Sequence, residues 1–373
     1  MSPAANIDGQ RGQRVRIVGT GLIGTSLGMA LSRAGFPVSL DDPSPTAAAL
    51  ARDLGAGALA VTVATAPDVV VVAAPPDVVA AVAAAELARW PDAVVTDVAS
   101  VKGAVLATLR EAGADLSRYV GSHPMAGRER SGAMAAQGDL FEGRSWVVAP
   151  GPEASAGAVD LVRQIAEAVG SVVLVMTPGE HDAAVAAVSH VPQIAASLVA
   201  SRLRDLPSSA VALSGQGIRD VTRIAASDPG MWTQILAGNA PAVRAVLESL
   251  AAELAAVLDA LRHLETDPGE GSVGARAALA RAVADGNAGH ALIPGKHGAA
   301  PTTYATVVVL VPDEPGALGR LLQDVGEAGV NMEDLRLEHG IGQPFGLAEL
   351  SVLPAAAQPL TTALRSLGWP VHE

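Results

Sequence analysis

The sequence predicts an α/β fold class: a doubly wound parallel sheet first, then an all-helical domain, then a small ferredoxin-like α+β domain. Three observations support this order. Short β-branched runs alternate with helical stretches up to residue 176, apolar residues then recur at helical spacing to Leu264, and a new strand begins at Tyr304. At 373 residues the chain is longer than one ordinary domain, so we expect three separate cores.

The domain boundaries follow the same changes of pattern. We divide the chain into an N-terminal tail, a parallel-sheet domain, a helical domain, a linker and a C-terminal domain, at residues 1–13, 14–176, 177–284, 285–303 and 304–373. The linker is rich in Gly, Ala and Pro and has no period. Within it, Lys296 and His297 fit either a solvated hinge or an anion contact between the catalytic and C-terminal domains.

Composition and charge exclude several classes of protein. The chain has 25 basic and 38 acidic side chains, a net charge of −13 and no Lys/Arg cluster, which disfavours nucleic acid as a partner. The N-terminus lacks the apolar core of a signal peptide, and the longest apolar stretch, Val69 to Ala85, is interrupted by Pro75 and Pro76. We therefore expect a cytoplasmic protein without a membrane partner. There is no cysteine, hence no disulfide or thiol nucleophile, and we expect no metal site.

A glycine-rich turn, G-T-G-L-I-G, lies between the first strand, Val15–Val18, and a helical stretch, Ser26–Ala34. The first glycine permits a tight turn, the second lets the backbone approach a pyrophosphate, and the third lets helix and strand pack closely. The first helical amides can bind an anion. The residues expected to bind the cofactor here are Gly19, Gly21, Leu22, Ile23 and Gly24. The alternative is a glycine turn in an α/β domain that binds no dinucleotide.

An acidic pair follows the second strand, Phe36–Leu40. Asp42 lies 18 residues after the last glycine of the turn, where a carboxylate accepts hydrogen bonds from a ribose 2′-hydroxyl and repels a 2′-phosphate. This predicts NAD rather than NADP, with Asp42 favoured over Asp41. The next strand is a continuous apolar run from Val69, and we expect Ala74 and Pro75 at its end to contact the cofactor.

One histidine lies where a substrate should meet the nicotinamide. Strand Ala93–Thr96 leads into D-V-A-S-V-K, and strand Arg118–Val120 leads into G-S-H-P, so Ser100 and His123 should share the carboxyl edge of the sheet. A hydride leaves a carbinol carbon as the hydroxyl proton is lost. Imidazole, with an unperturbed pKa of about 6.5, can accept that proton at neutral pH. Ser100 could orient the hydroxyl or the histidine. The alternative is a histidine that caps a turn beside a proline.

Several spaced motifs resemble those of the prephenate/arogenate dehydrogenase family over about Val15 to Leu264. The motifs are G-T-G-L-I-G, T-D-V-A-S-V-K from Thr96, G-S-H-P-M-A-G-R-E-R-S-G from Gly121, V-S-H-V-P from Val188 and D-V-T-R-I-A-A-S-D-P-G-M-W from Asp220. The resemblance implies oxidative decarboxylation, in which prephenate and NAD give 4-hydroxyphenylpyruvate, carbon dioxide and NADH.

The resemblance also implies roles for single residues. His123 becomes the hydrogen-bond acceptor for the ring 4-hydroxyl with Ser100 as its partner, and Arg223 becomes a bidentate clamp for a carboxylate. Gln193 stands where some members carry a second histidine, and Arg128 stands where others have a small polar residue, before Glu129. Arg128 could attract a second carboxylate or pair with Glu129. We expect these residues to bias substrate choice, and we favour prephenate over arogenate.

The helical domain is read from its apolar spacing. Pro178–Leu203 and Met231–Leu264 are predicted helices, and the second carries an apolar stripe that fits either a homodimer interface or a buried helix. We interpret His181, in the first helical turn, as structural. His190 fits either a residue near the substrate, as the resemblance implies, or a satisfied core histidine.

The last 70 residues predict the element order β-α-β-β-α-β, which resembles an ACT domain, a module that binds amino acids. The turn before its first helix leaves amides free for an α-carboxylate. The expected effector site is Asp313, Pro315, Gly316, Ala317, Leu318 and Asn331. The resemblance implies feedback control, with tyrosine as the first candidate and phenylalanine as the second; the alternative is a domain that only dimerises.

Two other functions compete with this interpretation. A different Rossmann hydroxyacid or imine reductase would need a helical lysine at its centre, and the helical stretches between Gly179 and Leu264 contain none. A catalytically silent NAD-responsive sensor would not need Ser100, His123 and Arg223 together.

Overall fold

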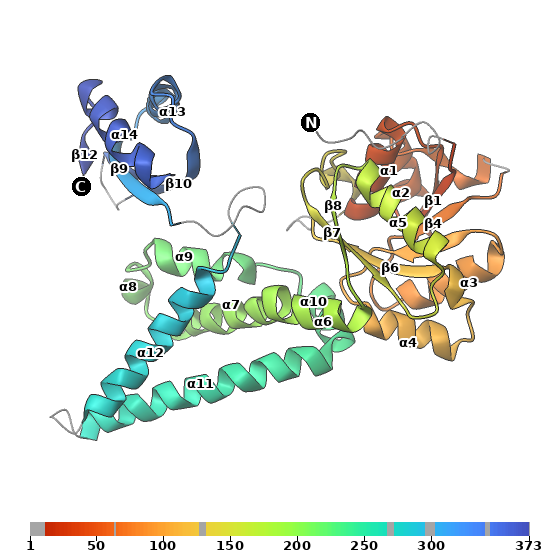
Figure 1. Cartoon of the computed structure of the whole chain (residues 1–373), viewed down its shortest axis with the longest axis horizontal. Helices are drawn as coiled ribbons and strands as arrows, with labels where there is room; N and C mark the ends of the chain where they lie inside the picture. Colours follow the sequence, from red (N-terminus) through yellow and green to blue (C-terminus); the bar gives the residue numbers. More distant parts are fainter. Residues whose placement is uncertain are drawn as a thin grey trace. The chain divides into compact units, whose positions relative to one another are not determined.

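A computed structural model describes residues 12–62, 65–126, 132–266, 272–294, 303–339 and 344–372. The chain forms two compact units, Met1–Ala251 and Ala252–Glu373, which are described separately. Figure 1 shows the elements in chain order, from the parallel-sheet domain to the C-terminal sheet.

The first unit contains a sheet of eight strands in the order β3-β2-β1-β4-β5-β6-β7-β8. Strands β1 to β6 pair in parallel, β7 is antiparallel to β6, and β8 is parallel to β7. The order reverses at β1, where doubly wound sheets bind their ligands. The strands are β1 Val15–Val18, β2 Val38–Asp41, β3 Ala58–Leu59, β4 Val69–Val72, β5 Val94–Asp97, β6 Tyr119–Pro124, β7 Ser145–Pro150 and β8 Val172–Val175.

Helices cover both faces of this sheet, which confirms the predicted doubly wound architecture (Figure 1). All four residues of β4 are fully buried: Val69 and Val71 belong to one hydrophobic core, and Val70 and Val72 to the other. This is why the strand reads as a continuous apolar run. The helices are α1 Leu22–Arg33, α2 Pro45–Asp53, α3 Val79–Arg89, α4 Gly103–Glu111 and α5 Ala156–Ala168, with short turns η2 Ala60–Thr62, η3 Leu116–Arg118 and η4 Ala133–Ala135.

The helical part of the first unit begins with a capping box, in which Thr177 and Glu180 bond each other's backbone amides. The predicted helix Pro178–Leu203 is interrupted by a π-helical turn, and the predicted helix Met231–Leu264 is broken at Asn239. The elements are α6 Pro178–Val185, π turn η5 Ala186–His190, α7 Val191–Arg202, η6 Leu203–Asp205, α8 Ser208–Val211, α9 Gln216–Thr222, η7 Arg223–Ala225, α10 Pro229–Gly238 and α11 Ala240–Thr266, whose residues from Ala252 onward belong to the second unit.

These helices expose many apolar side chains. The stretch Pro178–Asp205 is long and apolar enough to cross a membrane by length and composition alone, and 33% of its apolar 18-residue window is buried. On α11, leucines at three- and four-residue spacing form an exposed stripe: Leu250, Leu254, Leu258 and Leu261 are 42–56% exposed. A stripe of this kind indicates a covering partner.

The second unit ends in a four-stranded antiparallel sheet of order β10-β11-β9-β12 with two helices. The element order β-α-β-β-α-β predicted for this region is confirmed. Its elements are α12 Val273–His290, β9 Ala305–Pro312, α13 Ala317–Glu327, β10 Met332–His339, β11 Phe345–Val352, α14 Pro354–Ser366 and β12 Val371–His372. Its core contains Val309, Leu321 and Leu350. The linker starts later than predicted, because α12 continues to His290, and Lys296 and His297 lie outside the described residues.

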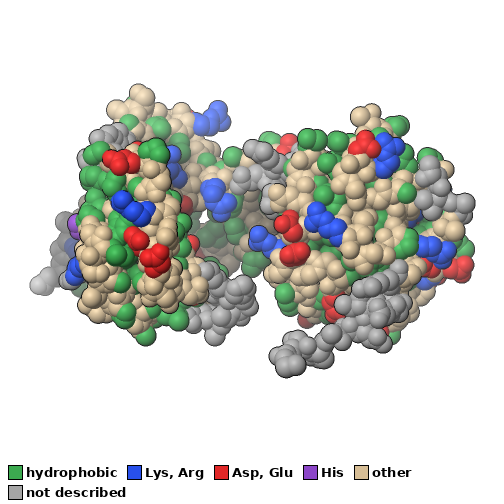
Figure 2. Space-filling model, turned by 90° about the horizontal axis from the view of Figure 1, so that it is seen from above, with side chains coloured by type: hydrophobic (Ala, Val, Ile, Leu, Met, Phe, Trp, Pro, Cys, Tyr) green, Lys and Arg blue, Asp and Glu red, His purple; other side chains and the backbone are tan. Residues whose placement is uncertain are grey.

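Charged side chains are dispersed on the face shown in Figure 2, where several basic groups lie beside acidic ones. Exposed ion pairs include Arg110 with Glu153 at 2.6 Å and Arg244 with Glu248 at 2.6 Å. Pairs of this kind stabilise a fold by at most about 1 kcal/mol each, so stability here depends mainly on the apolar cores.

Candidate active site

The glycine turn has the geometry that its sequence predicts. Gly19 has φ +102°, and a Cβ atom there would lie 2.3 Å from the carbonyl oxygen of Ala73. A Cβ atom on Gly24 would lie 1.9 Å from the carbonyl oxygen of Gly19, so helix and turn can approach only because both residues are glycine. These contacts hold the start of α1 directly against the ends of β1 and β4.

The N-terminus of α1 is open to an anion. Gly21 is its N-cap residue, no side chain caps the helix, and no atom lies within 4 Å of a Cβ built on Gly21. Leu22 and Ile23 are the first residues of this helix of 12 residues. Free amides at the helix start, beside open space, fit the pyrophosphate of a dinucleotide.

The two acidic residues after β2 have different partners. Asp41 pairs with the buried Arg16 at 2.5 Å, whereas Asp42 accepts hydrogen bonds from the amide and hydroxyl of Thr20, at 2.7 and 2.8 Å. Asp42 thus lies against the glycine turn, and a carboxylate has further lone pairs for a ribose hydroxyl. This arrangement supports Asp42 over Asp41. Ala74 and Pro75 follow β4, next to the Ala73 that contacts Gly19.

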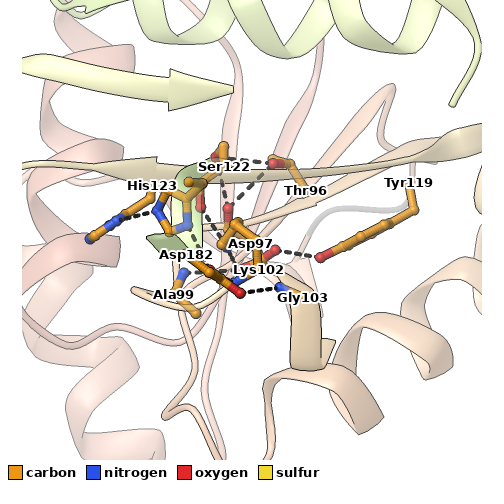
Figure 3. A network of polar contacts seen from close by, with 10 residues as sticks. Thr96, Asp97, Ala99, Lys102, Gly103, Tyr119, Ser122, His123 and Asp182 are labelled. Carbon is orange, nitrogen blue, oxygen red and sulfur yellow. Dashed lines mark hydrogen bonds and ion pairs between the residues drawn. The ribbon is translucent and has the colours of Figure 1, made fainter. Parts of the chain in front are cut away.

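A buried polar network ties β5 to β6 (Figure 3). Lys102 donates to the Asp97 carboxylate, and both side chains are fully buried. Lys102 also donates to the carbonyl oxygen of Ser122 at 2.7 Å, and Tyr119 donates to Asp97 at 2.6 Å. Burial lowers the pKa of Lys102, although Asp97 opposes this, and burial and the Asp97 charge raise the pKa of Tyr119 well above its ordinary value. This network fixes the backbone immediately before His123.

His123 lies within β6, not in a turn after the strand as the sequence suggested. It pairs with Val147 of β7 and is half-buried near the carboxyl end of the strand. Its Nδ1 lies 2.9 Å from Nε2 of His181. Burial, then the neighbouring His181 and Lys102, hold the pKa of His123 well below its ordinary value. The ring is therefore neutral at pH 7 and can accept a proton.

His181 and Asp182 are neighbours of His123 that the sequence did not indicate. His181 is fully buried, and its Nδ1 lies 2.8 Å from the Asp182 carboxylate. Asp182 also accepts hydrogen bonds from the amides of Lys102 and Gly103, at 2.9 and 2.8 Å. Burial opposes ionisation of Asp182, but the bonds from His181 and these two amides outweigh it and lower its pKa. The only sequence signal was an adjacent His-Asp pair in a helical first turn.

His190 ends the π turn and is almost fully buried. Asn239 donates to its Nδ1 at 3.1 Å and to the carbonyl oxygen of Asp182 at 2.8 Å, and Trp232 packs edge-on at 6.1 Å. Burial lowers the pKa of His190. Single-turn π-helices often occur at functional sites, and this one brings His190 toward the elements around His181. A hydrogen-bonded core histidine and a residue near the substrate both remain consistent with these contacts.

The other predicted substrate residues are distributed as follows. Ser100 is half-buried between β5 and α4, and its side chain has no hydrogen-bond partner among the described residues; His123 is paired with His181 instead. Gln193 is buried on α7 and accepts from Ser227 at 3.4 Å. Arg223 is exposed on η7, which packs against α7. Arg128 and Glu129 lie outside the described residues.

Comparisons with known proteins identify the family. The nucleotide-binding domain of prephenate dehydrogenase matches residues 27–175, and the dimerization domain of prephenate dehydrogenase matches residues 177–269. A probable prephenate dehydrogenase of Streptomyces niveus, NovF, is 38% identical over 359 residues, which cover 95% of this chain and 98% of that protein. The chain belongs to the prephenate dehydrogenase family.

Solved structures agree with this assignment. Prephenate dehydrogenase from Aquifex aeolicus, in complex with hydroxyphenyl propionate and NAD+, is 28% identical with a TM-score of 0.63, covering 74% of this chain and 97% of that one. The arogenate dehydrogenase of Synechocystis shares the fold, with a TM-score of 0.62 at 22% identity over 74% of this chain and 99% of that one. The predicted family, the NAD cofactor and the enzyme class, an NAD-dependent prephenate dehydrogenase, are thereby confirmed.

Proposed function

We propose that this enzyme catalyses the oxidative decarboxylation of prephenate to 4-hydroxyphenylpyruvate, a step of tyrosine biosynthesis. The observation that carries the proposal is a half-buried imidazole, His123, near the carboxyl edge of a sheet whose first turn fits a dinucleotide. Burial keeps the pKa of this imidazole low, which favours the neutral form that can accept a proton. A proton acceptor in this position can take the proton of the substrate's ring hydroxyl as the hydride is transferred.

The chain's own task is to position the substrate and polarise its hydroxyl. NAD, when bound, supplies the hydride acceptor. His123 accepts the hydroxyl proton as the hydride leaves. Loss of carbon dioxide then makes the ring aromatic, which drives the reaction, and the imidazolium returns the proton to the phenolate oxygen of the product. Ser100 lies in the loop after β5 and would orient the hydroxyl. Positioning and one proton acceptor therefore suffice.

The substrate's carboxylates need cationic partners. Arg223 is our candidate for a bidentate clamp on the pyruvyl carboxylate, because it lies on η7 and η7 packs against α7, which carries Gln193. Gln193 is uncharged and buried, so we assign it at most a neutral hydrogen bond. Arg128 adds attraction for a second carboxylate. Both substrates have two carboxylates, but arogenate also has an ammonium group that offsets part of their charge, so this attraction favours prephenate.

Steady-state kinetics with both substrates test this proposal. NADH formation should be faster with prephenate, as kcat/KM, than with arogenate. A larger kcat/KM for arogenate would reassign the enzyme to that substrate. The substitution Arg223→Lys keeps the charge but loses the planar fork, so it should raise KM more than it lowers kcat.

We propose a cytoplasmic homodimer built on the helical domain. The exposed leucine stripe of α11 and the apolar stretch Pro178–Asp205 supply surfaces that a second copy would cover, and the matched family domain is named for dimerization. Size-exclusion chromatography with light scattering should give twice the chain mass of 37.4 kDa. A stable monomer would contradict the dimer.

We also propose that the C-terminal sheet is an ACT-like regulatory domain that binds an aromatic amino acid, tyrosine first. Gly316, with φ +88°, is the N-cap of α13 and follows Asp313 and Pro315; Ala317 and Leu318 open the helix. No side chain caps this helix, which leaves its amides for an α-carboxylate. Asn331 is the last residue before β10, and its side-chain amide donates to Glu333 at 3.1 Å.

A pocket of about 400 Å³ is lined by Pro312, Arg320, Phe345 and Trp369 among others. Pro312 directly precedes Asp313, but none of the six expected effector residues lines the pocket. Arg320 stacks on Trp369 at 4.7 Å, so the pocket offers both a cation and aromatic surface. This composition suits an aromatic amino acid. Calorimetric titration of the full chain with tyrosine, phenylalanine and tryptophan should give heat with tyrosine; no heat with any of them would leave the domain a structural role.

A further inference from the structure

We propose that His181 and Asp182 fix the tautomer of His123, so that Nε2 of His123 carries the free lone pair that accepts the substrate proton. The inference rests on the proposed role of His123 as proton acceptor. His181 and Asp182 act through His123 and are positioning residues. Figure 3 shows the chain of contacts that runs from His123 to Asp182 and on to the start of α4.

The direction of each hydrogen bond follows from the one group that can only accept. An ionised carboxylate has no proton to donate, so Nδ1 of His181 donates to Asp182 across 2.8 Å. A neutral His181 then has its lone pair on Nε2. Nδ1 of His123 must therefore be the donor in the 2.9 Å contact between the two rings. In a neutral imidazole this leaves Nε2 of His123 unprotonated.

The ionised state of Asp182 is built into the fold. Its two oxygens accept the amides of Lys102 and Gly103, at 2.9 and 2.8 Å, at the N-terminus of α4. A Cβ atom on Gly103 would lie 2.8 Å from the Asp182 carboxylate, so the close approach requires glycine there. Two of the carboxylate's hydrogen bonds thus come from backbone amides, which can only donate.

The groups around His123 also favour its neutral form before reaction. After burial, the groups that lower its pKa are His181 from α6, Lys102 from the start of α4 and His190 from the π turn. The two carboxylates nearby are each paired with one of these groups, Asp182 with His181 and Asp97 with Lys102. When Nε2 takes the substrate hydroxyl proton, the imidazolium keeps its Nδ1 proton and its bond to His181. The positive charge is then balanced by Asp182 through His181, and no proton passes to the carboxylate.

Nitrogen NMR of the full chain, labelled with 15N-histidine, tests the tautomer without any substrate. In the unsubstituted protein at neutral pH, His123 should be protonated at Nδ1 and unprotonated at Nε2. Asp182→Asn removes the negative charge that holds Nδ1 of His181 as a donor, while the amides of Lys102 and Gly103 still need an acceptor. His123 should therefore show a larger fraction of the form protonated at Nε2. Protonation at Nε2 in the unsubstituted protein would overturn the inference, whatever the enzyme's substrate proves to be.

Kinetics of matched variants separate positioning from packing. Asp182→Asn and His181→Leu should lower kcat about 10²-fold with a smaller change in KM. In both variants part of His123 would be protonated at Nε2 and could not accept the substrate proton there. His181→Gln should recover most of the activity, because its carbonyl oxygen can accept from His123 while its amide donates to Asp182.

The control is Glu180→Gln on the same helix, whose exposed carboxylate accepts from the amide and the hydroxyl of Thr177. It should leave kcat unchanged. The acid limb of the pH profile should move in His181→Leu and stay in place in His181→Gln. Equal losses in His181→Gln and His181→Leu, with unchanged pH profiles, would show that His181 only packs against His123.

Discussion

Lys102 and Asp97 form an ion pair that is completely buried between β5 and β6. Lys102 also donates to the carbonyl oxygen of Ser122, the residue before His123 in β6. Removing one partner of such a pair leaves a charge without compensation in a nonaqueous environment. Lys102→Met should therefore lower the free energy of unfolding by about 3–5 kcal/mol, measured by urea denaturation. The exposed pair of Arg110 and Glu153 is the control: Arg110→Ala should change it by less than about 1 kcal/mol.

Substitution by alanine should affect NAD binding at one glycine of the turn and stability at another. At Gly21 a Cβ atom meets nothing within 4 Å, so Gly21→Ala should keep its melting temperature but bind NAD at least about tenfold more weakly, because the methyl group lies where the pyrophosphate approaches. At Gly24 the Cβ atom would meet the Gly19 carbonyl oxygen at 1.9 Å, so Gly24→Ala should lower the melting temperature itself. Calorimetry with NAD and thermal unfolding distinguish the two. Equal NAD affinity in Gly21→Ala would contradict the cofactor assignment.

Much of the fold could be predicted because its signals are local. The β-branched runs, the glycine turn and the acidic residue after β2 each depend on a few consecutive residues, and the structure places Asp42 against Thr20 as that pattern requires. The boundaries that were wrong lay where tertiary contacts override the pattern. His123 lies inside β6 because β7 pairs with it there, and local sequence carries no record of that partner.

The candidate site was only half predictable for the same reason. His123 and His181 are 58 positions apart, and their contact depends on β7 pairing antiparallel to β6 and on β8 following it. The π turn that ends at His190 has the same apolar spacing as an ordinary helix, so the sequence predicted one continuous helix. Residues whose function depends on such long-range pairing are recognisable only once the sheet is assembled.

Asp42 should decide the preference for NAD over NADP. Its carboxylate lies against the glycine turn and would face a 2′-phosphate, and like charges in contact disfavour binding by several kcal/mol. Asp42→Asn should lower the ratio of kcat/KM for NAD to that for NADP by at least about tenfold. Asp41→Asn is the matched control, because Asp41 pairs with Arg16 and should affect stability but not this ratio. An unchanged ratio in Asp42→Asn would remove Asp42 from the cofactor site.

Acid should reduce both activity and stability of the first unit, and the sign follows from the lowered pKa of His123. Burial and the neighbouring His181 favour the neutral ring, so the unfolded chain binds a proton here at higher pH than the folded one. The contribution to stability is therefore complete above the unfolded pKa of about 6.5 and is lost as pH falls toward the folded value. Asp182, with its own lowered pKa, adds a second loss at still lower pH.

We expect kcat/KM to stay constant above pH 6.5 and to fall at a lower pH that is set by the pKa of His123. His123→Asn should lose about 10²- to 10⁴-fold in kcat and retain NAD binding. An acid limb that persists unchanged in the residual activity of His123→Asn would show that another group is the proton acceptor.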